Sequence, residues 1–182
     1  MPVKIEAGQA TETVKLINWE HPKENDFALA EEVTLRGHHE RRPDLVLYVN
    51  GIAVGVIELK NSHTSIGDGI RQLLSNQQKE FNEWFFTPLQ IVIAGNDSEG
   101  LRYGSIKTEK KYFLQWKEDE ADNTRFKLDK YLLKMCRKNR LIELMHDFVL
   151  FDGGQKKLPR VHPYFCIKAS QPPLNLPTSV TA

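Results

Sequence analysis

Residues 42–61, RPDLVLYVNGIAVGVIELKN, decide the fold. Two runs rich in β-branched and aliphatic residues, 43–49 and 52–60, flank Asn50-Gly51. This dipeptide between two such runs is the strongest short-range signal for a β-hairpin. We therefore predict two antiparallel strands joined by a tight turn.

The length of the hairpin loop determines on which face of the sheet each charged side chain lies. Glu58 and Lys60 are two apart on one strand, so their side chains leave the same face. A regular two-residue loop would pair Asp44 with Ile57 and put Asp44 on the opposite face. A three-residue loop ending at Gly51, or a bulge in the hairpin, would put Asp44 on the face of Glu58. The two carboxylates can cooperate only in one of these latter arrangements.

Two carboxylates beside a lysine suit a divalent cation. The hard oxygen ligands of Asp44 and Glu58 are of the kind that binds Mg²⁺, which keeps several waters and binds phosphate oxygens. Lys60 could hold or help deprotonate an attacking water, or stabilise the charge of the transition state. This is the chemistry of metal-dependent phosphodiester hydrolysis. In the alternative interpretation, Glu58 and Lys60 are ordinary solvent-facing residues of an edge strand.

The composition limits the class of protein. The 182 residues are 40% hydrophobic and 27% charged, which is enough for one core and one domain. The formal net charge is +1, so any contact with DNA must come from a local patch. Two cysteines argue against a zinc cage and against a disulfide-rich secreted domain. No apolar run reaches membrane length and no signal peptide is evident, so we expect a soluble, cytoplasmic domain.

The rest of the chain alternates between strand and helix patterns. Apolar residues between Ile66 and Phe85 recur at three- and four-residue steps, which predicts one amphipathic helix ending before Pro88. Residues 128–150 are predicted to be helical, with a break near Asn139. Further strands are expected at residues 27–36, 89–94, 103–106 and 112–116. The fold class is α/β (α+β), with a central mixed β-sheet flanked by helices.

The hairpin region resembles the nuclease domain of the restriction (R) subunit of type I restriction–modification enzymes, which belongs to the PD-(D/E)xK nucleases. Further matches follow in order and extend the resemblance over roughly residues 14 to 168: Asn25-x-Phe27, Arg102-Tyr103-Gly104, Trp116, Phe148–Phe151 and Val161–Phe165. The resemblance implies a restriction-endonuclease-like fold, with residues 1–168 as the nuclease domain. Residues 169–182 contain three prolines and are expected to form a flexible tail.

Carried over by position, the resemblance implies that Asp44 and Glu58 are the metal ligands and that Lys60 is the catalytic lysine. The family also has a glutamine four residues before a tyrosine on the following helix. Gln72 matches the glutamine and Asn76 replaces the tyrosine. Gln72 is therefore either a supporting residue of the site or a plain helix-surface glutamine. No acidic residue upstream convincingly matches the further acid that the family often brings to this site.

The function implied by the resemblance is that of a Mg²⁺-dependent DNA endonuclease domain, which cuts unmodified foreign DNA away from the recognition site. The implied partners are double-stranded DNA, the methylation and specificity subunits, and ATP-driven translocase domains of the same subunit. The sequence has no G-x-x-x-x-G-K-[ST] loop, so we expect ATP to bind only those other domains. Two other functions stay open: a catalytically silent DNA-binding or structural module of the same fold, and a free-standing nuclease of the same superfamily.

Further polar residues outside the hairpin are candidates for binding roles. Five basic residues fall on one face of the predicted helix and either contact phosphates or form a solvated face: Lys127, Lys130, Lys134, Arg137 and Lys138. A looser basic loop contains Lys107, Lys110 and Lys111. His38-His39 beside Glu40 lack a third ligand at metal spacing, which favours a solvated loop. Cys136 is expected in the core.

Overall fold

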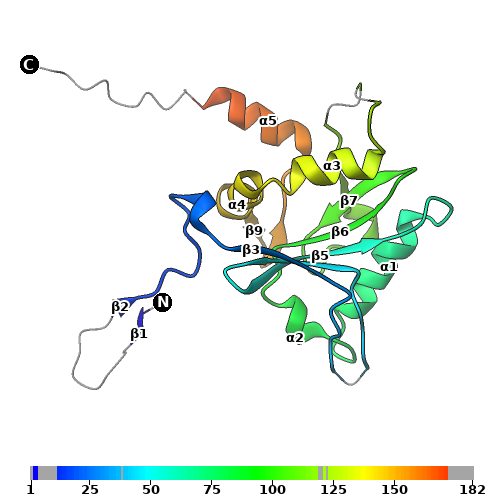
Figure 1. Cartoon of the computed structure of the whole chain (residues 1–182), viewed down its shortest axis with the longest axis horizontal. Coiled ribbons are helices and arrows are strands. Elements are labelled where there is room, and N and C mark those ends of the chain that lie inside the picture. The colour runs from blue at the N-terminus through cyan, green and yellow to red at the C-terminus, as the bar shows by residue number, and fades with distance from the viewer. Residues whose placement is uncertain (1, 4–11, 38, 119–120, 122, 172–182) are drawn as a thin grey trace, which may run out of the picture.

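A six-stranded mixed sheet forms the centre of the protein (Figure 1). The computed structural model describes residues 2–3, 12–37, 39–118, 121 and 123–171. The strands follow their order in the chain: β3 (Phe27–Glu31), β4 (Leu45–Val49), β5 (Ile52–Leu59), β6 (Ile91–Asn96), β7 (Gly100–Gly104) and β8 (Leu114–Gln115). β5 and β6 run parallel, and the other neighbouring pairs run antiparallel. The mixed sheet predicted from the sequence is confirmed.

Helices cover both faces of this sheet (Figure 1). On one face lie α1 (Ile66–Asn76) and α2 (Glu83–Phe86), whose apolar side chains share a core cluster with Val46, Val56 and Val92. On the other face lie α3 (Lys127–Met135), α4 (Lys138–Asp147) and α5 (Val161–Ser170). Burial of the alternating sides of the strands against both helix layers explains why their sequences read as nearly continuous apolar runs.

The hairpin between β4 and β5 is tight and bulged. Asn50 and Gly51 both have positive φ, 50° and 77°, as a two-residue turn of the I′ kind requires. Next to the turn, Tyr48 pairs with Ala53, but Leu47 pairs with Gly55, so Val54 is an extra residue on β5. The two-residue loop with a bulge is therefore the correct alternative, and the three-residue loop is wrong.

The helix predicted from Ile66 to before Pro88 is interrupted, which corrects the sequence-based expectation. α1 ends at Asn76, and residues 77–82 form turns before α2 begins. The interruption coincides with a polar stretch in which the backbone N–H of Asn82 bonds to the carbonyl of Asn76. Asparagine and serine side chains compete with helical backbone bonds and favour such ends.

The C-terminal third contains elements that the sequence patterns did not predict. The helical region breaks at Cys136-Arg137, slightly before the expected position. It is followed by the hairpin β9 (Leu150–Asp152) and β10 (Gln155–Lys157), whose turn contains Gly153 and Gly154, both with positive φ. α5 continues to Ser170, and the flexible tail expected at residues 169–182 stays a prediction, because residues 172–182 lie outside the described part of the chain.

The remaining elements are short: β1 (Pro2–Val3) pairs with β2 (Glu12–Thr13), and single 3₁₀ turns occur at Pro22–Glu24 and Lys110–Tyr112. Within the described residues, no helix is long and apolar enough to cross a membrane.

Candidate functional site

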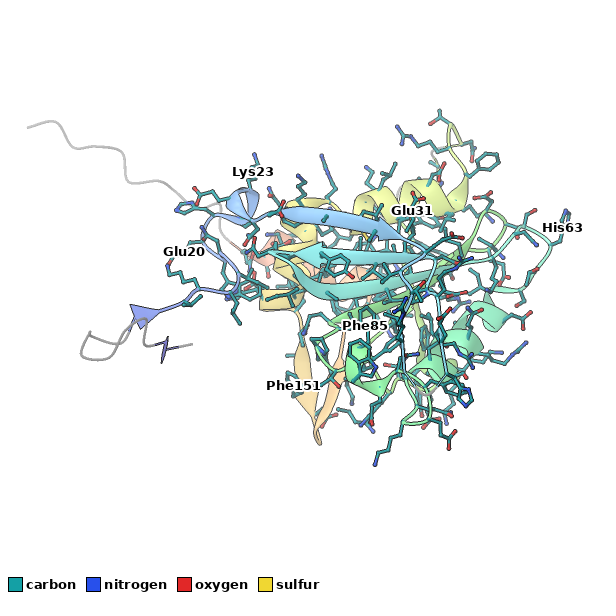
Figure 2. The ribbon with its side chains drawn as sticks, turned by 60° about the horizontal axis from the view of Figure 1, so that its bottom comes forward. Glu20, Lys23, Glu31, His63, Phe85 and Phe151 are labelled. Atoms are coloured by element: carbon teal, nitrogen blue, oxygen red, sulfur yellow. The ribbon has the colours of Figure 1, made fainter. Side chains whose placement is uncertain are left out.

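The predicted site residues gather at one end of the central sheet. Asp44 immediately precedes β4, Glu58 lies at the end of β5, and Lys60 follows it. Continuing the register of Val46 with Val56 places Asp44 opposite Glu58 on the face covered by α1. Figure 2 shows Glu31, the last residue of β3, and His63, in the loop after β5, toward this same end of the sheet.

Hydrogen bonds join three of the side chains and anchor the fourth, Asp44, to the backbone of β5. The ammonium group of Lys60 donates to Glu58 Oε1 at 2.7 Å and to Gln72 Oε1, on α1, at 2.8 Å. The backbone N–H of Leu59 donates to Asp44 Oδ2 at 2.6 Å. The structure thus brings Gln72 into contact with the lysine, whereas Asn76 lies one turn further along α1, away from this contact.

Burial gives Glu58 an unusual titration. Its side chain is 1% exposed, and this desolvation raises the pKa of Glu58 to about 6. The hydrogen bond from Lys60 opposes the rise, and the negative charge of nearby Asp44 adds to it. The second carboxylate oxygen of Glu58, Oε2, is buried without a hydrogen-bond partner in the described residues. A buried carboxylate oxygen without a donor calls for a cationic partner.

The donor set fits a hard divalent cation. Glu58 Oε2 and the carboxylate of half-buried Asp44 supply oxygen ligands on the same face. Among the described residues, no group of three or more His, Cys, Asp or Glu side chains could hold a metal. A cation held by Asp44 and Glu58 would therefore take its other ligands from water and substrate, as Mg²⁺ commonly does.

Close packing of α1 covers the buried end of this cluster. A Cβ atom added to Gly69 would lie 3.6 Å from Glu58 Cγ and 3.5 Å from Lys60 Cγ. The helix backbone thus approaches β5 closely at Gly69, which accounts for the exclusion of water from Glu58. The side chain of Lys60 remains 20% exposed, so the cluster is reached from its lysine side.

The cavities found elsewhere do not include these four residues. One of about 930 Å³ lies between residues 14–20 and the end of α4, and one of about 450 Å³ lies between residues 104–114 and the β9–β10 hairpin. These two cavities therefore lie apart from the candidate site.

A comparison with protein families supplies independent information. A sequence profile of the type I restriction enzyme R protein N terminus matches residues 2–111 of the chain. The chain belongs to this family. The matched segment of the R protein N terminus contains Asp44, Glu58, Lys60 and Gln72.

Several curated relatives in the type I restriction enzyme family are similar over most of the chain. A putative type I restriction enzyme MjaIXP endonuclease subunit from Methanocaldococcus jannaschii is 26% identical over 87% of the chain and 17% of its own length. The HindI endonuclease subunit from Haemophilus influenzae is 26% identical over 86% of the chain and 16% of its own length. The EcoprrI endonuclease subunit from Escherichia coli is 25% identical over 81% of the chain and 49% of its own length. The chain thus spans about a sixth of the length of the first two relatives. It is an N-terminal domain of the type found in type I restriction endonuclease subunits.

The five basic residues predicted to share one helix face do not share one. α3 ends at Met135 and α4 starts at Lys138, so Arg137 lies in the break between two helices. Lys130 is buried, with only 6% of its surface exposed, and the ammonium group of Lys138 lies 5.1 Å from the centre of the Phe27 ring. The prediction failed because it extended one helical period through Cys136. Lys127 and Lys134 belong to α3, and DNA binding by this set stays a prediction.

His39 and Cys136 are not part of the cluster. His39 is exposed and its ring lies 5.5 Å from that of Phe81, while His38 lies outside the described residues. Cys136 is half-buried and packs against the core, where burial raises the pKa of its thiol to about 12.

Sequence reasoning missed Asn96 and Glu99, which contact the segment leading from Lys60 into α1. Residues 95–100, between two expected strands, carry only a turn pattern. A signal was present, since a polar residue, Asn96, follows the apolar strand at residues 89–94 after a single glycine, Gly95.

Proposed function

We propose that this chain is the Mg²⁺-dependent DNA endonuclease domain of a type I restriction–modification R subunit. In this proposal it hydrolyses phosphodiester bonds of unmodified foreign DNA away from the recognition site. The observation that carries the proposal is the buried, unpartnered Oε2 of Glu58 opposite Asp44 and hydrogen-bonded through Oε1 to Lys60, within a family named for restriction endonucleases.

Each side chain has a distinct part in this proposal. Asp44 and Glu58 would hold Mg²⁺, which when bound supplies positive charge at the scissile phosphate and acidifies a water ligand. Lys60 presents its ammonium group where charge gathers on the phosphate and where the attacking water must be oriented. Gln72 Oε1 accepts a hydrogen bond from Lys60 and thereby restricts its rotation.

The charge balance of the cluster supports these parts. Without a cation, two carboxylates and one ammonium group leave one net negative charge near a buried oxygen. Binding of Mg²⁺ would reverse that sign and make the same position attractive for the phosphates of DNA. The side chain of Lys60, which is 20% exposed, is the part of the cluster that a DNA phosphate would reach from solvent.

The partners of the complete enzyme are part of the proposal. As the family resemblance implies, the domain would act beside translocase domains of the same subunit, which would bind ATP. It would assemble with methylation and specificity subunits on double-stranded DNA in the cytoplasm.

A Mg²⁺ titration tests the proposal. Asp44→Asn keeps an acceptor for the Leu59 N–H but removes the charge, so we expect calorimetric Mg²⁺ affinity to fall about tenfold or more. Asp97→Asn, an exposed aspartate in the turn between β6 and β7, should bind Mg²⁺ like the wild type. Equal affinities for all three proteins would contradict the proposal and favour a catalytically silent module.

A further inference from the structure

The turn between β6 and β7 is bonded to the segment that connects Lys60 to α1. Asn96 is completely buried, and its side-chain Nδ2 donates to the carbonyl of Thr64 at 2.8 Å. The hydroxyl of Ser98 donates to the carbonyl of Ser62 at 2.9 Å. The carbonyl of the preceding Gly95 accepts the backbone N–H of Lys60 at 2.9 Å. Residues 95–98 are therefore bonded to the backbone of Lys60, Ser62 and Thr64.

Glu99 extends this contact to the helix itself. Its Oε1 accepts the backbone N–H of Ile66, the first residue of α1, at 2.9 Å. The same oxygen accepts a weaker bond from Asn96 Nδ2 at 3.3 Å. A carboxylate at this position satisfies a free N–H and interacts favourably with the positive end of the helix dipole. The helix start is thus fixed by a side chain from a different part of the chain.

The internal bonds of the turn hold the two side chains in place. Asn96 Oδ1 accepts the backbone N–H of Glu99 at 2.6 Å. All the polar atoms of the Asn96 side chain are therefore used, so its orientation is determined by its partners. The result is a rigid support at the end of β6, the strand paired with β5.

The orientation of α1 matters because the helix carries Gln72. From Ile66 to Gln72 the helix rises about 9 Å, so a small tilt at its start moves the Gln72 side chain relative to Lys60. Gly69 leaves little space between α1 and β5, and the Lys60–Gln72 bond of 2.8 Å tolerates only a small displacement.

We propose that Asn96 and Glu99 are positioning residues of the nuclease site: they fix the start of α1 so that Gln72 meets Lys60. This inference rests on the proposed function. It assigns no contact with DNA or metal to either residue. In the opposing view, the turn contributes to folding stability alone.

Glu99 offers the cleaner test, because it is exposed and its replacement leaves no buried polar atom of its own. We compare Glu99→Ala with Glu99→Gln, which keeps an Oε1 acceptor, and with Asp97→Ala. Asp97 is an exposed acid of the same turn whose side chain has no hydrogen bond or ion pair with the described residues. All variants are studied in the complete 182-residue chain below their melting temperatures.

The first measurement is made by NMR without metal. In Glu99→Ala we expect the Ile66 amide to exchange about fivefold faster with solvent, as loss of a helix cap implies. We also expect the Gln72 side-chain amide signals to move, with recovery in Glu99→Gln and no change in Asp97→Ala. A purely structural turn would lower the melting temperature without moving the Gln72 signals, and that result would overturn the inference.

The second measurement separates this inference from the proposed function. Mg²⁺ is titrated into the same proteins by calorimetry. If the wild type binds no Mg²⁺, the proposed function fails, while the Gln72 signals still report whether Glu99 positions the helix. If the wild type binds Mg²⁺ and Glu99→Ala leaves the Gln72 signals unchanged, only the positioning role fails.

Discussion

At the scale of single residues, Lys60 is the side chain that joins β5 to α1 within the cluster. Its ammonium group is bonded to an acid on one side and an amide on the other. In a full-length subunit we expect Lys60→Ala to abolish DNA cleavage but leave ATP hydrolysis and translocation largely intact. Loss of one such electrostatic group costs roughly a hundred- to a thousandfold in rate.

Paired assays of ATPase rate and plasmid cutting, on wild type and variant, check this expectation. Lys79→Ala, an exposed lysine after α1, serves as the control. Parallel loss of both activities in Lys60→Ala would mean that Lys60 has a structural role.

The raised pKa of Glu58 predicts that the free energy of unfolding depends on pH. Its pKa is raised from 4.5 to about 6 in the folded protein, so between these values the folded state binds more protons than the unfolded state. Stability from this group is fully present below pH 4.5 and is lost as pH rises through 6. The loss amounts to about 2 kcal/mol, the free energy that corresponds to this shift.

The comparison uses Glu58→Gln, which cannot ionise. In metal-free buffer, its free energy of unfolding relative to wild type should increase by about 2 kcal/mol between pH 4.5 and pH 7. Urea titrations across this range measure the difference. A difference that does not vary with pH would show that Glu58 has an ordinary pKa, contrary to its burial beside Asp44.

At the scale of elements, the approach of α1 to β5 determines how closed the site is. A methyl group at Gly69 would meet Ala94 Cβ at 3.3 Å, a tight but adjustable contact, and would favour the helical conformation. We therefore expect Gly69→Ala to change the free energy of unfolding by less than about 1 kcal/mol. Gly69→Val adds two methyl groups over Glu58 and Lys60, and should cost about 1–3 kcal/mol and separate Gln72 from Lys60.

Urea titration gives the stability of both variants, and the NMR signals of the Gln72 side chain report the contact. Unchanged Gln72 signals in Gly69→Val would mean that α1 can shift without disturbing the cluster.

The elements also show what the sequence could and could not predict. The turn at Asn50-Gly51 was predictable, because a two-residue loop of positive φ selects that dipeptide. The bulge at Val54 was less predictable, since Gly55 is an isolated glycine of the kind that marks a bulge or a close backbone approach but does not fix which residue is extra. The proximity of Gln72 and Lys60 rested on family resemblance. The bond between Glu99 and α1 joins residues 33 positions apart and depends on tertiary packing that no local pattern encodes.

At the scale of the whole molecule, the chain is one part of a larger architecture in its relatives. It spans 17% of the M. jannaschii relative and 16% of the H. influenzae relative. We expect the 182-residue chain on its own to cleave duplex DNA weakly or undetectably, because within the described residues no third acid joins Asp44 and Glu58, and no translocase delivers DNA in the assay.

Supercoiled plasmid incubated with the chain and Mg²⁺, with and without ATP, provides the measurement, and Asp44→Asn is the blank. Robust cleavage without ATP at physiological salt would contradict this expectation and favour a free-standing nuclease.

The bulged hairpin also influences the order in which the molecule assembles. Asp44 and Glu58 are fourteen positions apart, and hairpins close in about 1–10 μs, whereas pairing of β5 with β6 must await the crossover formed by residues 60–90. The acid pair therefore forms early, and α1 adds Gln72 late.

Gly51→Ala, strained at a φ of 77°, should mainly slow folding, whereas Glu99→Ala should mainly speed unfolding. Stopped-flow folding and unfolding rates distinguish the two, and the same rate changing in both variants would refute this order. The carboxylates of Asp44 and Glu58 would thus be held together before Gln72 fixes the position of Lys60. Assembly of the site would begin with the repulsion between two carboxylates and end when the ammonium group of Lys60 compensates it.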